Sequence, residues 1–460
     1  MDKKKLIYFA LGAVVLLPSC SQDEPSKREP RGDATPIYFR SYLPTVTQSR
    51  AEVVATGNFT NCQVTCFNPE DAELIDSDGK LMPFFHDICF QKNEDGNFVL
   101  PEEEILWPTA SGKLHFFAYY PSVASLKETI GIDSCELVNA SSILPDGKTA
   151  IDYRLNNFVV AHEIADQVDF VTAYNAASLY ETGGSGIALN FTHQLARVEI
   201  SAWGANEKYS FEIAGVRIGN PLTQGDFNLS ALMAADNSSP VWENTGFQSV
   251  VEHIFTPGET IALVGNGNHE SEEDVVSVMG AGGPAMVIPM SQRIEAWEGK
   301  NDPAISNEHY TTDRMYFSTL LRVKNRDGEV VYPYPNDRTG MNVIYFAVDT
   351  DGKIAERLYK VGEQYFTTPD PADDDTPYAI GDTEQICGFG WASLPVAARW
   401  EAGKIYAYKL NYTSGIGWHD PSDPTPGEPI IERGKIPFNV DVDEWIPAED
   451  YNSDLTVPKR

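Results

Sequence analysis

The stretch IALNFTHQLARVEISAW, residues 187 to 203, decides the fold class of this 460-residue chain. Strand alternation places Phe191, His193 and Leu195 on one face, and a period of two predicts a half-buried β-strand. A histidine between two apolar neighbours is more often a buried, hydrogen-bonded structural residue than a catalytic one. We therefore expect strands here and a structural role for His193.

The same period recurs on both sides of this stretch. In IYFRSYL, residues 37–43, Ile37, Phe39 and Leu43 share one face. Glycine, proline, asparagine and aspartate separate these short runs, and 51 aromatic residues (22 Phe, 21 Tyr and 8 Trp) favour strands over long helices. Short strands between such turns predict an all-β fold of sandwiches or barrels. Further candidate strands are 61–67, 113–120, 151–160, 169–174, 209–220, 260–265, 285–290, 315–325, 341–349, 404–413 and 435–445.

A glycine-rich segment, ETGGSG at residues 181–186, has the most permissive backbone in the first half of the chain. It predicts a boundary between an N-terminal domain, residues 35–180, and a C-terminal domain, residues 181–460. Long loop insertions are expected at residues 266–282, 295–307 and 362–382. Polar residues with prolines at 20–34 indicate a flexible tether.

The first 19 residues have the proportions of an export signal, with Lys3 to Lys5 before a short apolar run. LPSC at residues 17–20 resembles a bacterial lipobox, which implies removal of the signal and lipidation of Cys20. Acyl chains contribute about 0.8 kcal/mol per buried methylene, so several of them would hold the protein on a membrane. An ordinary secretory signal with an incidental cysteine is the alternative. Asp23 and Glu24 resemble a surface-export tag of Bacteroidetes lipoproteins.

Charge and cysteine content exclude some classes of partner and site. The chain has 34 basic and 67 acidic residues, a net charge of −33, which argues against nucleic acid or anionic lipid as a partner. The odd number of cysteines after Cys20 cannot all pair with one another, so buried thiols are expected, with one bridge left open. No spacing of cysteine and histidine suits a metal. These cysteines are Cys62, Cys66, Cys89, Cys135 and Cys387.

Motifs of catalysis are absent from the sequence. It contains no glycine-rich phosphate loop, no HExxH pair and no GxSxG elbow, so we expect neither an enzyme nor a cofactor. A pair of carboxylates of the kind that glycosidases use is left open, because acidic residues are numerous.

Five stretches, taken in order, resemble the fimbrillin superfamily of Bacteroidetes. The resemblance implies two transthyretin-like β-sandwich domains with long loop insertions, in a subunit of a type V pilus that is exported as a lipoprotein to the outer membrane and cell surface. The stretches are WPTASGKLHFFAYYP (107–121), DFVTAYN (169–175), the opening stretch, WEAGKIYAYKLNY (400–412) and IPFNVDVDEW (436–445).

In that superfamily an arginine-specific protease removes the first strand of the exported precursor, and a strand of the neighbouring subunit fills the groove. The resemblance implies cleavage between Arg50 and Ala51, which would release strand 37–43; an uncut exposed loop is the alternative. A candidate donor strand has its apolar side chains on one face, which suits insertion into a half-open sandwich. Four such side chains would contribute roughly 6–12 kcal/mol gross. They are Ile436, Phe438, Val440 and Val442. The alternative is a last strand paired within its own domain.

We expect a tip or accessory subunit of a fimbrium that acts in cell adhesion and biofilm formation. Its partners would be other fimbrial subunits, a maturation protease and an unknown surface ligand. A stalk or anchor subunit is one alternative. A surface glycan-binding lipoprotein is another, with aromatic platforms drawn from Trp242, Trp297, Trp391 and Trp418.

Overall fold

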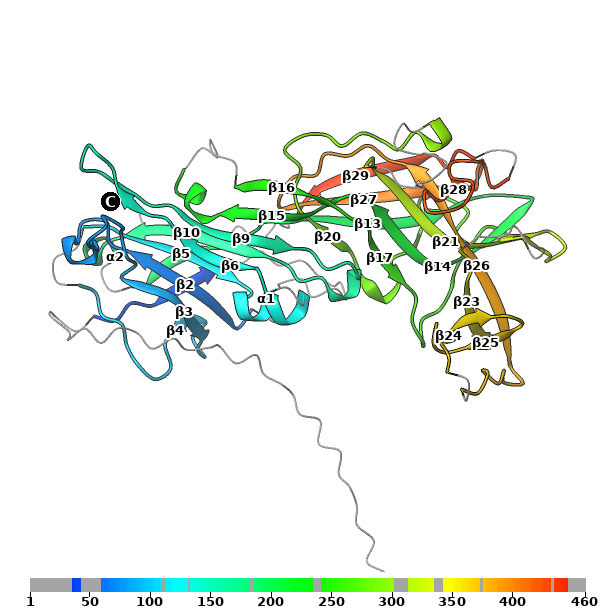
Figure 1. Ribbon diagram of the computed structural model, residues 1–460, viewed down its shortest axis with the longest axis horizontal. Coiled ribbons are helices and arrows are strands. Elements are labelled where there is room, and N and C mark those ends of the chain that lie inside the picture. Colours follow the sequence, from blue (N-terminus) through cyan, green and yellow to red (C-terminus); the bar gives the residue numbers. More distant parts are fainter. Residues whose placement is uncertain are drawn as a thin grey trace, which may run out of the picture.

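The computed structural model describes residues 35–42, 59–108, 112–130, 133–182, 185–234, 241–301, 313–334, 342–372, 375–431 and 434–445. The predicted signal segment, the tether, Cys20, Arg50 and Ala51 lie outside these ranges. Strands dominate the described residues, which confirms the all-β prediction (Figure 1).

The first sheet contains residues from both ends of the N-terminal half and runs through eight described strands. Its strand β10 also contacts β11, because Asn175 Nδ2 donates to the Ala188 carbonyl at 2.6 Å, so the sheet curls towards closure. In order across the sheet the strands are β11 (Ile187–Asn190), β1 (Phe39–Tyr42), β4 (Asn97–Val99), β3 (Phe85–Lys92), β2 (Asn61–Phe67), β5 (Leu114–Tyr120), β10 (Val171–Ala177) and β12 (Thr192–His193).

A second sheet, of four described strands, packs against the outer face of the first. Tyr153 joins them, because its hydroxyl lies 2.8 Å from Thr65 Oγ1 and its ring contacts Phe67. The strands are β16 (Trp242–Gln248), β15 (Leu222–Asn228), β9 (Tyr153–Val159) and β6 (Glu136–Asn139). A small hairpin, β7 (Ser142–Ile143) and β8 (Thr149–Ala150), lies beside it.

Two further sheets form the other end of the molecule, at the right of Figure 1. The smaller one contains β19 (Val276–Ser277), β13 (Ala196–Trp203), β27 (Lys404–Asn411) and β29 (Phe438–Glu444), with β20 (Ala285–Val287) on β13. The larger one contains β17 (Val251–Ile254), β14 (Tyr209–Gly219), β21 (Tyr316–Asn325), β26 (Glu384–Pro395), β23 (Ile344–Asp349), β24 (Ile354–Val361) and β25 (Gln364–Phe366), with β18 (Ala262–Val264), β22 (Val330–Tyr332) and β28 (Trp418–His419) on its flanks.

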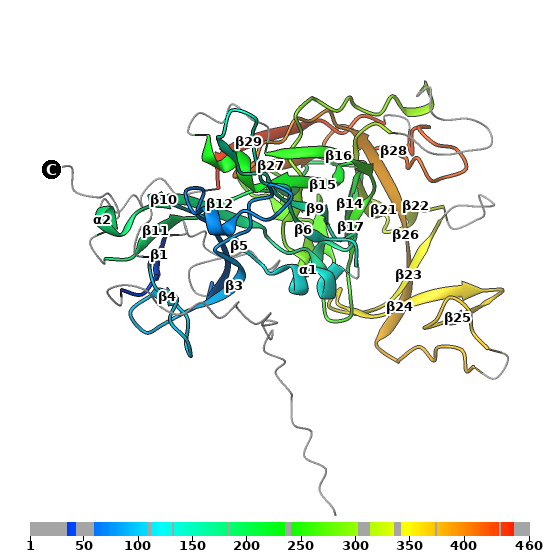
Figure 2. The same ribbon diagram turned by 60° about the vertical axis from the view of Figure 1, so that its left-hand side comes forward.

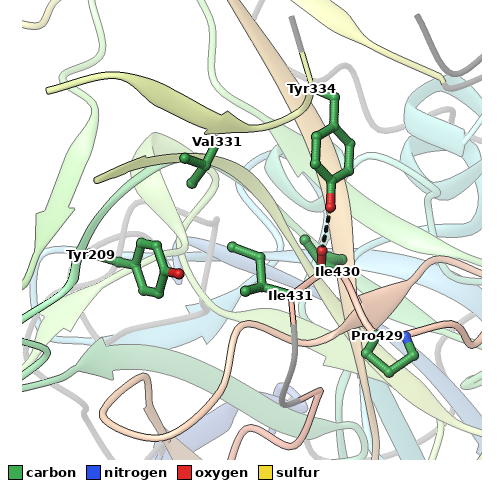
Figure 3. A pocket seen from close by; sticks show the side chains of 6 residues that line it. All are labelled: Tyr209, Val331, Tyr334, Pro429, Ile430 and Ile431. Atoms are coloured by element: carbon green, nitrogen blue, oxygen red, sulfur yellow. Dashed lines mark hydrogen bonds between the residues drawn. The ribbon is translucent and has the colours of Figure 1, made fainter. Parts of the chain in front are cut away.

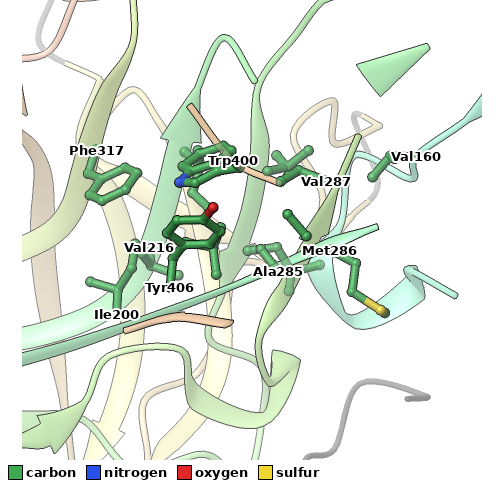
Figure 4. Packing of buried hydrophobic residues seen from close by; sticks show 14 of the residues in the cluster. Val160, Ile200, Val216, Ala285, Met286, Val287, Phe317, Trp400 and Tyr406 are labelled. Atoms are coloured by element: carbon green, nitrogen blue, oxygen red, sulfur yellow. The ribbon is translucent and has the colours of Figure 1, made fainter. Parts of the chain in front are cut away.

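Apolar side chains that alternate along β13, β14 and β21 meet between these two sheets. Ile200 of β13, Val216 of β14 and Phe317 of β21 are buried there together with Trp400 and Tyr406 (Figure 4). This core continues to Tyr153 and Phe67, so it also joins the sheets of the N-terminal half. A separate apolar core fills the inner face of the first sheet.

Helices are short in the described part of the chain. The longest, α1 (Val123–Ile130), begins after Ser122, whose Oγ accepts a hydrogen bond from the Ser125 amide at 3.1 Å and so satisfies a free amide of the first turn. The others are α2 (Leu179–Thr182) and the 3-10 turns η1 (Ala72–Leu74), η2 (Ile164–Asp166), η3 (Leu229–Met233), η4 (Gly280–Gly282) and η5 (Gly299–Asn301).

The sheets do not divide at the predicted boundary between residues 180 and 181. Strands β11 and β12 follow the boundary in sequence but pair with the first sheet, whereas β9 precedes it and pairs with β15. Glycine content is a local property of the sequence, whereas hydrogen bonds between distant strands decide which residues share a sheet. The two-domain division stays a prediction.

Candidate functional site

Strand β1 lies inside the first sheet, although it is the first described strand of the chain. It pairs in parallel with β11, with Phe39 beside Ile187, and antiparallel with β4, with Phe39 beside Phe98 (Figure 2). Its ladder extends outward, since the Ile187 amide donates to the Tyr38 carbonyl at 2.9 Å and the Ile37 amide donates to the Ile105 carbonyl at 2.7 Å. We call residues Ile37–Tyr42 and the groups that contact them the β1 site.

Apolar contacts fill the inner face of the β1 site. Phe39 is completely buried, and its ring meets those of Phe90 and Phe116 edge to face, with centroids 4.8 and 5.4 Å apart. Ile37 is buried in the same cluster, whereas Ser41 is only half-buried. The predicted alternation of Ile37 and Phe39 on one face is therefore confirmed.

Gly186 shapes the outer face of the β1 site. It has a φ of +80°, and a Cβ atom there would lie 2.5 Å from the Tyr38 ring. Tyr38 therefore packs directly on the glycine backbone. The sequence indicated a joint at residues 181–186, and the close approach of Tyr38 to Gly186 could not be recognised from it.

Two thiols belong to the same apolar core as Ile37 and Phe39. Cys62 and Cys66 of β2 are fully buried free thiols, and burial raises the pKa of both well above the ordinary value. Cys135 and Cys387 are also free and buried. Protonated, inaccessible thiols serve as packing groups and not as nucleophiles or metal ligands. Buried thiols were the predicted state.

Strand β29 is an edge strand that pairs antiparallel with β27 along its whole length. Lys404 with Glu444 and Lys409 with Asp441 form ion pairs at 2.6 and 2.9 Å between the two strands. The predicted apolar face is only partly covered, because Ile436 is buried and Phe438 half-buried, but Val440 and Val442 are 42% and 51% exposed.

The far end of β29 is held by Trp445, which is fully buried. Its indole stacks on the ring of His193, with centroids 4.2 Å apart and planes 3° from parallel. His193 Nδ1 in turn lies 2.7 Å from Asp169 Oδ2, and both side chains are buried. His193 is thus the structural residue that its apolar neighbours predicted. We call Trp445, His193 and Asp169 the Trp445 contact.

The glycan-platform alternative does not hold for two of its four tryptophans. Trp297 and Trp391 are only 1% and 2% exposed, so their faces cannot stack on a sugar. The guanidinium carbon of Arg217 lies 4.1 Å from the centre of the Trp391 ring. Trp242 and Trp418 are half-buried, and Trp242 Nε1 donates to the Gln194 carbonyl. Aromatic residues in this fold serve mainly as core.

A shallow pocket lies beside the segment that leads into β29 (Figure 3). Tyr209, Val331, Tyr334, Pro429, Ile430 and Ile431 line it. The Tyr334 hydroxyl donates to the Ile430 carbonyl at 2.7 Å, and no charged side chain is among the lining residues. Among the described residues, no group of three or more histidine, cysteine, aspartate or glutamate side chains could hold a metal ion.

A buried histidine of β17 links two glutamates from separate turns of the chain. His253 Nδ1 lies 2.7 Å from Glu163 Oε1, and its Nε2 lies 3.0 Å from Glu259 Oε2. Burial disfavours the charged ring, but the hydrogen bonds to the two carboxylates outweigh it and raise the pKa of His253 to about 9. The three residues form an ion-paired junction in which each ring nitrogen has a partner, which is a structural arrangement.

The sequence and the structure were compared with those of known proteins. The sequence model described as fimbrillin-like matches residues 49–301, which is more than half of the chain. No curated protein matches the sequence. Among solved structures, a fimbrial protein from Bacteroides vulgatus has 12% identity and a TM-score of 0.47, over 89% of this chain and 99% of that one. A candidate cell adhesion protein from Bacteroides eggerthii has 9% identity and a TM-score of 0.37, over 91% and 98%.

Within the part of the chain that the structure describes, no helix has the length and apolar character to cross a membrane. The extent of the sequence match decides the family. The chain belongs to the fimbrillin-like family.

Proposed function

We propose that this protein is a structural, non-enzymatic subunit of a cell-surface fimbrium, a type V pilus, and that its β1 is replaced by a strand of a neighbouring subunit. The observation that carries the proposal is the position of β1. A strand of four residues lies between two others in a sheet and contributes to an apolar core, yet it precedes all the other described strands in the sequence.

Cleavage between Arg50 and Ala51 by an arginine-specific protease would convert β1 into a separate peptide. Only hydrogen bonds and apolar contacts would then hold residues 35–42 in the sheet. Burial of Ile37 and Phe39 stabilises the bound peptide by about 1.5–3 kcal/mol each. The entropy that the cut peptide gains on release opposes this stabilisation.

Departure of β1 would leave two strands, β11 and β4, with unpaired backbone groups, and would uncover Phe90 and Phe116. An exposed strand edge beside an apolar groove is a template for another strand. The same cut would detach the lipid on Cys20, so the precursor is held at the outer membrane and the mature chain enters the fimbrium.

Within the fimbrium we propose a tip or accessory position, with a role in adhesion and biofilm formation. The segments predicted as long insertions support this, since residues 266–282 and 362–372 with 375–382 hold only short elements such as β19, η4 and β25. Loops of this kind suit a binding surface better than a stack of tightly fitted copies.

Mass spectrometry of the amino terminus of the protein on cells tests the proposal. An amino terminus at Ala51 is the expected result. A lipidated Cys20 on the protein in assembled fimbriae would contradict cleavage and indicate an anchoring subunit instead.

A further inference from the structure

Strands β23, β24 and β25 form a projecting part of the largest sheet, which we call the wing. In both views they lie at the end of the molecule that is away from the first sheet (Figures 1 and 2). The β1 site, where a neighbouring subunit would attach, is in the first sheet. A subunit held through its β1 site would therefore present the wing at its other end.

One face of the wing carries two tyrosines. Tyr345 of β23 is directly opposite Leu358 of β24. Tyr365 of β25 is directly opposite Lys360 of β24. Side chains directly opposite on paired strands share a face, as do residues two apart on one strand, so these four side chains and Glu356 lie on one surface. We call Tyr345, Glu356, Leu358, Lys360 and Tyr365 the tyrosine face.

The two rings of the tyrosine face are held by their surroundings. Their centroids are 5.2 Å apart and their planes are 69° from parallel, which is an edge-to-face contact. A Cβ atom on Gly388, opposite Tyr345 on β26, would lie 3.1 Å from the Tyr345 ring, so this ring packs against the glycine backbone. The Tyr365 carbonyl accepts a hydrogen bond from the Tyr378 amide at 2.7 Å. Tyrosines that are already fixed lose little conformational entropy when a partner binds.

The tyrosine face is separate from the large apolar cores. Leu358 is only 2% exposed, yet none of the larger cores formed by the described residues includes it. Tyr345 and Tyr365 are half-buried, and Lys360 is exposed. Half-exposed aromatic rings around a small apolar centre are typical of the middle of a protein interface.

Charge around the tyrosine face favours one kind of partner. Between residues 344 and 384 the described chain has eight acidic and three basic residues. Lys360 Nζ lies 3.9 Å from Glu363 Oε2, so the positive charge on the face has an acidic neighbour. Glu384 Oε2 accepts a hydrogen bond from the Tyr378 hydroxyl at 3.0 Å, which brings another carboxylate beside an aromatic ring. Aromatic rings and carboxylates together attract lysine and arginine side chains, through cation–π contacts and ion pairs.

We infer that the tyrosine face is an adhesive surface of this subunit and that it binds a basic peptide segment of a protein on the target cell. This inference deepens the adhesive role in the proposed function and rests on it for the setting in which the surface acts. Cationic side chains of the segment would lie over the rings of Tyr345 and Tyr365, and Glu356 would pair with one of them. The net charge of −33 would speed the approach of such a partner.

Peptide binding to the uncut full chain tests this inference. The probe is a short fluorescent peptide in which arginine alternates with threonine, and the matched peptide has glutamine in place of arginine. Fluorescence anisotropy gives the dissociation constant of each peptide. We expect the arginine peptide to bind roughly tenfold more tightly than the glutamine peptide, because only it offers cations to the rings and carboxylates. Most of this difference should disappear between about 50 mM and about 300 mM salt, because salt screens exposed charges.

Substitutions on the tyrosine face separate a specific contact from general attraction to an acidic protein. Tyr365→Ala should weaken binding of the arginine peptide roughly tenfold, whereas Tyr365→Phe keeps the ring and should change binding by less than about twofold. Glu356→Gln should weaken binding roughly threefold, and Lys360→Gln, which removes a like charge, should strengthen it by about the same factor. The matched control is Glu103→Gln, which removes an exposed carboxylate outside the wing and should leave binding unchanged.

The possible results separate the inference from the proposed function. Equal effects of Glu356→Gln and Glu103→Gln, or no gain from Lys360→Gln, would overturn the inference, because the peptide would then be bound by net charge alone. Binding of a neutral oligosaccharide such as maltohexaose through the same tyrosines, with no preference for the arginine peptide, would also overturn it and assign the surface to glycans. Assembly of the cut chain without peptide binding would contradict the inference alone. Peptide binding as expected, by a chain that does not assemble after the cut at Arg50, would contradict the proposed function alone.

Discussion

Replacement of Phe39 by alanine tests how strongly the β1 site holds its strand. Phe39 is fully buried between Phe90 and Phe116, and truncation of a buried phenylalanine costs about 3–5 kcal/mol. Each edge-to-face contact contributes about 0.5–1.5 kcal/mol of interaction beyond the buried area. Because β1 is only four residues long, a loss of this size should release it before the rest of the sheet unfolds.

Hydrogen exchange followed by mass spectrometry measures the effect on the uncut chain. Backbone amides of β11 and β4, which flank β1, should exchange faster by the factor that corresponds to about 3–5 kcal/mol, up to the limit of global unfolding. Tyr180→Ala is the control, since that side chain is 96% exposed and its loss should change stability by about 0.5 kcal/mol or less. A loss below about 1 kcal/mol for Phe39→Ala would refute the view that this ring anchors the strand.

Three further predictions concern other parts of the molecule. Trp445→Ala should speed hydrogen exchange along β29, because it removes the stack on His193, while Val442→Ala, at a half-exposed position, should change it little; equal effects would mean that Trp445 does not retain the strand. The His253 junction should stabilise the fold fully below pH 6.5 and lose up to about 3 kcal/mol as the pH rises through 9, because the folded-state pKa is raised from 6.5 to about 9. Urea unfolding at pH 6 and pH 9.5 measures this, and His253→Gln should flatten the dependence; an unchanged dependence in that variant would assign the effect to other groups. The free thiols of Cys62, Cys66, Cys135 and Cys387 should resist a thiol reagent in the folded chain and react on unfolding, and rapid labelling of Cys62 or Cys66 without denaturant would contradict their burial.

Local patterns in the sequence predicted the strands well. The alternation of residues 187–203 correctly indicated strand structure, although the structure divides this run into β11, β12 and β13, and the pair Ile37 and Phe39 correctly indicated the buried face that leads into β1. Side-chain alternation is a property of the strand itself, so it can be read without knowledge of the partner strands. The structural role of His193 followed in the same way from its neighbours Phe191 and Leu195.

Pairing between distant segments could not be predicted. The glycine-rich segment at residues 181–186 suggested a domain boundary, but β11 returns to β1 and β9 crosses to β15, and no local signal marks these pairings. The exposure of Val440 and Val442 could not be predicted either. Alternation shows that two side chains share a face, but it does not show whether another part of the protein covers that face. The burial of Trp297 and Trp391 depends on contacts of the same long-range kind.

The molar mass of the chain after cleavage at Arg50, measured by light scattering with and without separation of the released peptide, tests the central claim most directly. We predict that the peptide containing Ile37–Tyr42 leaves and that the remaining chains associate. A cut chain that stays monomeric, with the peptide still bound or with the first sheet closed without it, would contradict the account.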